Sequence, residues 1–150
     1  MKHLKRIVVT LAAVFALLLV FNVKAEASIT GGSVSFSSKT DTSVTVSWTA
    51  PTINNEYYSS SSYVYTIDSY SLEINSEIVG KVSASSRKAT VTGLAKGWYG
   101  YVYVYANYTQ KYTDSSGTVS YSTSRKMLGS AKCNTTPGNA TWKSISPYTN

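Results

Sequence analysis

Hydrophobic and polar residues alternate with a period of two along most of this chain, most clearly over residues 99–106, YGYVYVYA. Side chains on a strand change face at every residue, so this spacing gives one apolar face and one aromatic face. A helix, with its period of about 3.6, would spread the tyrosines around its circumference. We therefore predict a central antiparallel strand with Val102 and Val104 in the core and with four outward tyrosines: Tyr99, Tyr101, Tyr103 and Tyr105.

Six further alternating segments are separated by clusters of Gly, Asn, Ser and Pro, which is typical of short strands joined by turns. They cover residues 33–37, 43–48, 67–74, 77–82, 88–92 and 118–124. The pattern predicts an all-β fold, an antiparallel β-sandwich of about seven strands. Asn75-Ser76 should form a turn, and residues 52–66 and 108–117 are predicted to be polar loops. The expected inward residues are Val34, Phe36, Val44, Val46, Trp48, Tyr70, Leu72, Ile74, Ala89 and Val91.

Residues 1–27 have the features of a secretory signal peptide. A basic start precedes an apolar run over residues 7–21, and small residues at Ala25 and Ala27 match a cleavage site. The alternative is an uncleaved membrane anchor, but the run is shorter than the ~20 residues that a spanning helix needs. We expect cleavage near Ala25 or Ala27, a secreted or cell-surface location, and no membrane span afterwards.

Charge and cysteine content narrow the choice of compartment and partner. The formal net charge is +7, and removal of the leader leaves ten basic and six acidic side chains. These charges are scattered, whereas nucleic-acid-binding proteins usually carry a basic cluster, so we expect no nucleic acid partner. Cys133 is the only cysteine, which predicts either a spare thiol or an intermolecular partner. A secreted domain without disulfides must depend on its core, and this favours a bacterial source.

Three groups of core residues follow one another along the chain: a Val44-Val46-Trp48 strand that closes on Pro51, then Tyr70 and Leu72, then Leu94 before the central strand. In this order and at this spacing they resemble the fibronectin type III family, in its secreted bacterial form. The resemblance covers roughly residues 33–125 and implies an immunoglobulin-like sandwich. Members of this family commonly occur as arrays of adhesion or spacer modules.

One corner of the resembled fold departs from the family pattern. The family usually has a tyrosine six residues after the leucine, whose hydroxyl ties down a corner between strands. This chain has Gly100 at that position, and it has Lys96 in place of the usual proline. Trp98, Tyr99 or Tyr101 could take the tyrosine's place if a local bulge shifted the register.

The domain organisation follows from these assignments. We predict a signal peptide at residues 1–27, a fibronectin type III-like domain at 28–130, and a linker at 131–150. Residues 138–144, GNATWKS, align with GSVSFSS at 32–38, which indicates the start of a second, truncated repeat. An ordinary C-terminal tail is the alternative.

The sequence offers no catalytic constellation. The only histidine, His3, lies in the leader, Cys133 has no partner at zinc-ligand spacing, and no Gly-rich phosphate loop is present. No pair of carboxylates is selected by its spacing. We therefore expect a protein that is not an enzyme, with no catalytic residue, no cofactor and no metal.

The 13 tyrosines are the residues from which ligand binding can be argued. The central-strand group would form either a sheet-stabilising surface or an aromatic platform for sugars or a neighbouring domain. A second group lies among Ser, Asn and Thr in the two predicted loops, which would emerge at one end of the sandwich, and this mix suits a recognition surface. The candidate ligand-binding residues are Tyr57, Tyr58, Tyr63, Tyr108, Tyr112, Tyr99, Tyr101, Tyr103 and Tyr105.

These observations lead to two functional hypotheses. The first is a non-catalytic module that serves as a spacer or as an adhesion domain, with an extracellular protein or polysaccharide as its partner. Neighbouring fibronectin type III repeats would be further partners if the chain is a fragment. The alternative is a carbohydrate-binding accessory domain of an extracellular polysaccharide-degrading enzyme.

Overall fold

The computed structural model describes residues 28–137, and all of the regular structure in this range is β-strand. None of these residues forms a helix long and apolar enough to cross a membrane. The predicted signal peptide and the repeat-like segment at 138–144 lie outside the described residues. The strands are β1 (Ser28–Thr30), β2 (Val34–Lys39), β3 (Val44–Trp48), β4 (Thr52–Asn54), β5 (Glu56–Tyr57), β6 (Ser62–Ile74), β7 (Glu77–Ser83), β8 (Lys88–Val91), β9 (Tyr99–Thr113) and β10 (Val119–Asn134).

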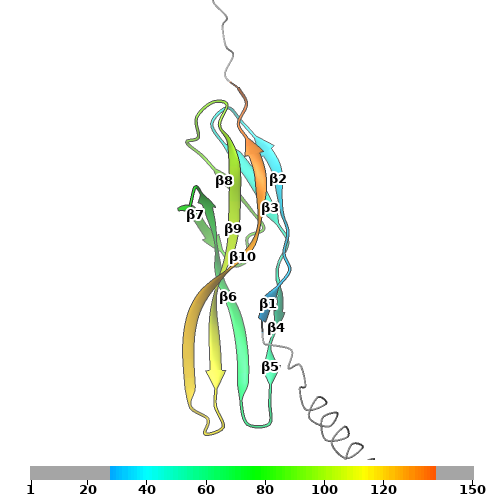
Figure 1. Ribbon diagram of the computed structural model, residues 1–150, viewed down its shortest axis with the longest axis vertical. Coiled ribbons are helices and arrows are strands. Elements are labelled where there is room, and N and C mark those ends of the chain that lie inside the picture. Colours follow the sequence, from blue (N-terminus) through cyan, green and yellow to red (C-terminus); the bar gives the residue numbers. More distant parts are fainter. Residues whose placement is uncertain (1–27, 138–150) are drawn as a thin grey trace, which may run out of the picture.

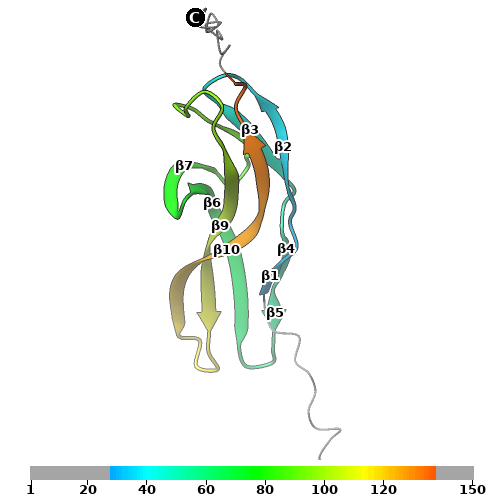
Figure 2. The same ribbon diagram turned by 45° about the horizontal axis from the view of Figure 1, so that its top comes forward.

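The strands form two main sheets and one small one, and every pairing is antiparallel. The three-stranded sheet has the order β2-β3-β8, and the larger sheet has the order β10-β9-β6, to which β7 and β5 add at different parts of β6. β1 pairs with β4. Figures 1 and 2 show that the two main sheets face each other in one half of the molecule. This arrangement confirms the all-β prediction and is consistent with a β-sandwich.

The other half of the molecule is an extension of the larger sheet. β6, β9 and β10 are 13, 15 and 16 residues long, and at about 3.3 Å per residue they reach well beyond the short three-stranded sheet (Figure 1). We call this extension the arm. It consists of β5 together with residues 62–67, 108–113 and 119–124.

The core lies between the two main sheets and is built from the residues that the alternation predicted. Val44, Val46 and Trp48 on β3 are buried against Tyr70 and Leu72 on β6 and against the inward side of β9. The ring centroids of Trp48 and Tyr70 are 5.3 Å apart. The predictions for these positions and for Ile74, Val91, Val102 and Val104 are confirmed.

Strand β2 agrees only partly with its predicted inward residues. Val34 packs against the core as expected. The prediction for Phe36 is wrong: this side chain remains 38% exposed, because it lies on edge strand β2 beside a register shift.

The predicted turn at Asn75-Ser76 is confirmed, since both residues have positive φ angles, 51° and 66°, as a tight hairpin requires.

The prediction of two long polar loops at residues 52–66 and 108–117 is wrong. The first contains β4, β5 and the start of β6, and the second is strand as far as Thr113, where a short turn leads to β10. The physical reason is that the three-stranded sheet does not extend over the arm (Figure 1), so the arm strands carry few of the inward aliphatic residues that mark a half-buried strand.

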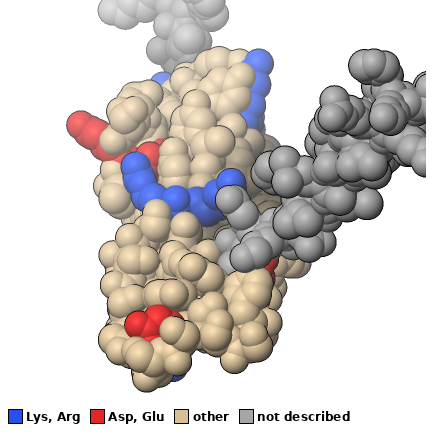
Figure 3. Space-filling model, turned by 60° about the horizontal axis from the view of Figure 1, so that its bottom comes forward, with Lys and Arg blue, Asp and Glu red and all other residues tan. Residues whose placement is uncertain are grey.

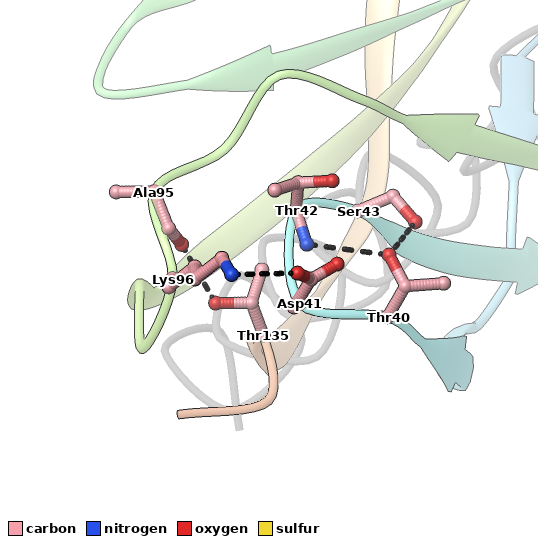
Figure 4. Close-up of polar contacts among 7 residues, drawn as sticks. All are labelled: Thr40, Asp41, Thr42, Ser43, Ala95, Lys96 and Thr135. Carbon is pink, nitrogen blue, oxygen red and sulfur yellow. Dashed lines mark hydrogen bonds and ion pairs between the residues drawn. The ribbon is translucent and has the colours of Figure 1, made fainter. Parts of the chain in front are cut away.

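Strand β10 continues to Asn134, so residues 131–134, predicted as part of a linker, are paired with β9. The chain beyond them is held at the end of the sandwich (Figure 4). The Thr135 hydroxyl is buried and donates to the Ala95 carbonyl at 2.8 Å, and the Thr136 amide donates to the Thr40 carbonyl at 2.8 Å. Nearby, Lys96 forms an exposed ion pair with Asp41 at 3.2 Å. The packed unit therefore extends at least to Thr136.

Cys133 is a core residue of β10 and does not lie in a C-terminal tail, where the sequence suggested either a spare thiol or an intermolecular partner. It is 1% exposed, and its thiol donates to the Ala131 carbonyl. Burial raises the pKa of the Cys133 thiol, because a thiolate would lose its hydration there. The alternation that puts Ala131 and Cys133 inward belongs to a strand that the prediction ended too early.

We expect Cys133 to resist alkylation while the protein is folded. A maleimide should modify it at least about 100-fold more slowly in buffer than in denaturant, since reaction requires opening of the core. Mass spectrometry of timed, quenched samples measures both rates. Similar rates in the two conditions would show that β10 opens readily near its end.

Candidate functional site

The first group of predicted tyrosines lies together on β9, on the side of the sheet that faces away from the core. The burial pattern of β9 alternates from Tyr99 onward, with buried aliphatic residues between the tyrosines. Tyr99 is 60% exposed and Tyr101 is 47% exposed, while Tyr103 and Tyr105 are half-buried. The rings of Tyr101 and Tyr103 are 6.3 Å apart. We call these four tyrosines the outer tyrosine face.

A buried carboxylate lies beside this face. Glu73 on β6 is opposite Tyr103 in the register of the sheet, and it is 5% exposed although it points away from the core. Arg125 on β10 forms an ion pair with Glu73 and lies over the ring of Tyr105, 4.5 Å from its centroid. Burial and the negative charge of Glu73 raise the pKa of the Tyr105 hydroxyl. The contacts link three neighbouring strands, and we call Glu73, Tyr105 and Arg125 the cross-strand clamp.

The outer tyrosine face borders a depression of about 260 Å³. Its polar groups come from Glu73 and from Asn75 and Ser76 in the β6–β7 turn. Its aromatic walls come from Tyr101, Tyr103 and Tyr105. Sequence reasoning selected the tyrosines but missed the polar residues, because only the pairing of β6 with β9 brings the turn beside them. An arrangement of aromatic rings beside carboxylate and amide groups can both stack on a ligand and hydrogen-bond to it.

Trp98 occupies the corner before this strand. A side chain at Gly100 would place its Cβ 2.6 Å from the Trp98 ring, and Trp98 is partly buried against the core. The register between β9 and β10 is regular at Gly100, which pairs with Cys133, so the bulge suggested by the sequence is absent at this position. Glycine is therefore required here because the indole ring fills the space that any side chain would need.

The second group of predicted tyrosines gathers on the arm rather than in loops. Tyr63 on β6 stacks at a 30° tilt on Tyr112 of β9, with centroids 4.8 Å apart, and Tyr58 meets Tyr63 edge-on at 6.4 Å. Tyr65 and Tyr108 form another edge contact at 5.7 Å. We call these five residues the arm tyrosine cluster. Tyr57 is 72% exposed and pairs with Ser62, so it lies on the opposite side of the arm from Tyr63.

The outer tyrosine face and the arm tyrosine cluster are on opposite faces of one sheet. β9 has no bulge in its pairing with either neighbour, since the register shifts fall on β6 and β10. Odd-numbered β9 residues such as Tyr101 and Tyr105 therefore point one way, and even-numbered ones such as Tyr108 and Tyr112 point the other. The two groups cannot contact the same small ligand, and they form two separate candidate surfaces.

The charges around these surfaces are mixed. A second depression of about 440 Å³ is lined by Lys81 and Arg125 together with Asp68 and by neighbouring polar residues of β9 and β10. Figure 3 shows basic side chains in a band across the middle of one face, with acidic side chains on both sides of it. Within residues 28–137, no group of three or more His, Cys, Asp or Glu side chains is placed to hold a metal ion.

Comparison with models of known protein families gives no match to this chain, and comparison with curated proteins gives none either. The assignment of function therefore depends on the residues and their geometry.

Proposed function

We propose that this chain is a secreted or cell-surface, non-catalytic adhesion module that contacts its ligand through the outer tyrosine face. The observation that carries the proposal is a set of four tyrosines on one strand face, of which Tyr99 and Tyr101 are 60% and 47% exposed. Exposed aromatic patches on a small domain commonly mark contact sites. The signal-peptide pattern of residues 1–27 and the resemblance of residues 33–125 to the fibronectin type III family support the same role.

A rigid support favours binding by this face. The buried side of β9 is fixed by the core, and the cross-strand clamp limits the movement of Tyr105. Lys132 lies 5.1 Å from the centroid of the Tyr99 ring, a cation–π contact that favours this orientation of the exposed ring. Tyrosines that are ordered before binding lose little conformational entropy when a ligand arrives.

Carbohydrate binding is the second candidate, and the depression beside the face favours it. Sugar rings present apolar C–H faces together with hydroxyl groups. Tyr101 and Tyr103 supply surfaces for stacking, while Glu73 and Asn75 line the same depression with hydrogen-bonding groups. In this case the chain would act as an accessory domain that holds an enzyme on its polysaccharide.

Replacing Tyr99 and Tyr101 with threonine should weaken ligand retention at least about tenfold, since threonine preserves strand propensity but removes the aromatic surface. The protein, purified after expression of the full chain, is incubated with insoluble polysaccharides, with cell-wall material and with immobilised extracellular proteins. The bound fraction is then measured by sedimentation or surface capture. Circular dichroism checks that each variant is folded.

The Tyr57→Thr/Tyr58→Thr variant is a matched control, because it removes one tyrosine of the arm and the tyrosine that follows it, both distant in sequence from Tyr99 and Tyr101. Loss of binding in the outer-face variant but not in the control would support the proposal. Retention on polysaccharide would favour the carbohydrate role, and retention on protein would favour adhesion. Loss only in the control would assign binding to the arm. Failure of the unaltered protein to bind any of these materials would contradict the adhesion role and leave that of a spacer.

A further inference from the structure

With one exception, the longer sheet edges in the described residues carry a feature that discourages pairing with another chain. β2 has a register shift between Phe36 and Ser38 and ends in Lys39. β7 has an irregular register and contains Lys81. β8 is only four residues long and begins with Lys88. Bulges, lysines and short lengths are the usual protections of edge strands.

The exception is the arm portion of β10. Residues 118–124, TVSYSTS, contain no charge, proline or glycine, and all of them are exposed, including Tyr121 at 68%. From Val119 onward their register with β9 is unbroken. In Figures 1 and 2 this part of β10 forms the outer border of the arm, with no strand beyond it. It therefore presents alternate backbone N–H and C=O groups that have no partner strand.

The same strand is protected where it borders the core. A register shift lies between Met127 and Gly129, and Gly129 packs beside Val34 of β2. On the other border of the arm, β6 is covered by β5 and by Asn55, whose side-chain oxygen accepts from the Tyr65 amide at 2.8 Å. Among the longer sheet edges of residues 28–137, protection is thus missing only over the uncharged segment of β10.

We propose that this edge binds the same edge of a second copy of the chain, in antiparallel register about a two-fold axis at Tyr121. That register pairs Val119 with Thr123, Ser120 with Ser122, and Tyr121 with its own counterpart. Strand-forming residues meet on both sides, and the tyrosine pair adds a cross-strand aromatic contact. The pairing is isologous, so it closes after two copies and forms no fibre.

Charge favours this partner over an unrelated strand. The basic residue Lys126 follows the segment on one side, next to Arg125, which is already paired with Glu73, and Asp114 lies in the turn just before the segment. In the antiparallel register, the basic end of each copy reaches the turn that carries Asp114 of the other. Each end therefore brings opposite charges together, whereas a parallel register would align like charges.

Sedimentation equilibrium of the protein, expressed as the full chain, tests the association. We expect a dimer with a micromolar dissociation constant, because one strand pairing buries less than the ~1,600 Å² of a standard interface. The variant Tyr121→Lys/Thr123→Lys should raise that constant about tenfold or more, since it places like charges opposite each other. The control Ser60→Lys/Thr92→Lys adds the same charge at exposed positions away from this edge. It should leave the dissociation constant of the dimer unchanged.

Disulfide trapping tests the register while keeping Tyr121. The variants Val119→Cys and Thr123→Cys are mixed under mild oxidation. In the proposed register the two new thiols are directly opposite, with Cα atoms about 5 Å apart, whereas like positions are about 13 Å apart. We expect a linked dimer in the mixture and not in either variant by itself.

Several results would overturn the proposal. They are a monomer at all concentrations up to about millimolar, where micromolar association would be complete, an equal effect of the two lysine pairs, and equal cross-linking in the mixture and in each single variant. These results are independent of ligand retention by the outer tyrosine face, so the two proposals can fail separately.

Discussion

Replacing Arg125 with alanine should lower the free energy of unfolding by about 3 kcal/mol, because it leaves the Glu73 carboxylate buried without its partner. Glu73 is 5% exposed and Arg125 is the cation that pairs with it. The Arg125 side chain is itself 48% exposed, so its own desolvation cost is modest and most of the penalty arises at the carboxylate. Urea denaturation of both proteins measures the difference.

The variant Glu73→Gln supplies the control for this prediction. In that background no buried charge remains, so Arg125→Ala should cost only about 1 kcal/mol, for lost packing over Tyr105 and a lost hydrogen bond. A double-mutant cycle over the four proteins gives the coupling between the two side chains. An equal cost of Arg125→Ala in both backgrounds would show that the clamp is a surface contact of little energetic weight.

The second large effect is expected at Gly100. Gly100→Ala should destabilise the protein by about 2 kcal/mol, because a new Cβ would lie 2.6 Å from the Trp98 ring and a packed ring must move. Thermal unfolding measures the loss, and Trp fluorescence reports movement of the indole.

Gly80 provides a matched strand glycine, where a Cβ would meet Leu72 at an ordinary 3.9 Å. Gly80→Ala should have little effect or a small stabilising one, since it reduces the freedom of the unfolded chain. Replacing the indole ring with a smaller side chain, in the variant Trp98→Leu, should make Gly100→Ala nearly neutral in that background. If Gly100→Ala were as harmless as Gly80→Ala, the Trp98 ring would not be the reason for glycine at this corner.

The part of the fold that has two layers was predictable from the sequence, because alternation is strong where one face is buried. The spacing of Val44, Val46 and Trp48, and that of Val102 and Val104, placed each of these residues correctly. The arm was not predicted, because both of its faces carry Ser, Thr and Tyr, and such strands lack the aliphatic alternation that distinguishes them from loops. A bulge at Asp68 also moves the inward residues of β6 from odd positions, ending at Ile67, to even positions, starting at Tyr70.

The candidate site was predictable only in its aromatic part. The face of each β9 tyrosine follows from its local spacing, because side chains alternate along a strand. Continuing this alternation from Tyr105 to Tyr108 would have placed Tyr108 and Tyr112 on the opposite face. The burial of Glu73 depends instead on Arg125, which is 52 residues away in the chain. No local pattern contains that pairing, and a carboxylate on the outward side of a strand gives the impression of being solvated until its neighbours across the sheet are known.

The first and last described residues lie toward opposite ends of the long axis of the molecule, and this has a mechanical consequence. Residues 28–30 run beside the arm, and the described chain leaves the sandwich at the opposite end, past Thr136 (Figure 1). Tension between these points would act nearly along the strands. Ladder hydrogen bonds are perpendicular to the strands, so such a load shears many of them together instead of peeling them apart one by one. A chain held at a cell surface by one end and loaded by a ligand or neighbour at the other would therefore resist extension in its strongest direction.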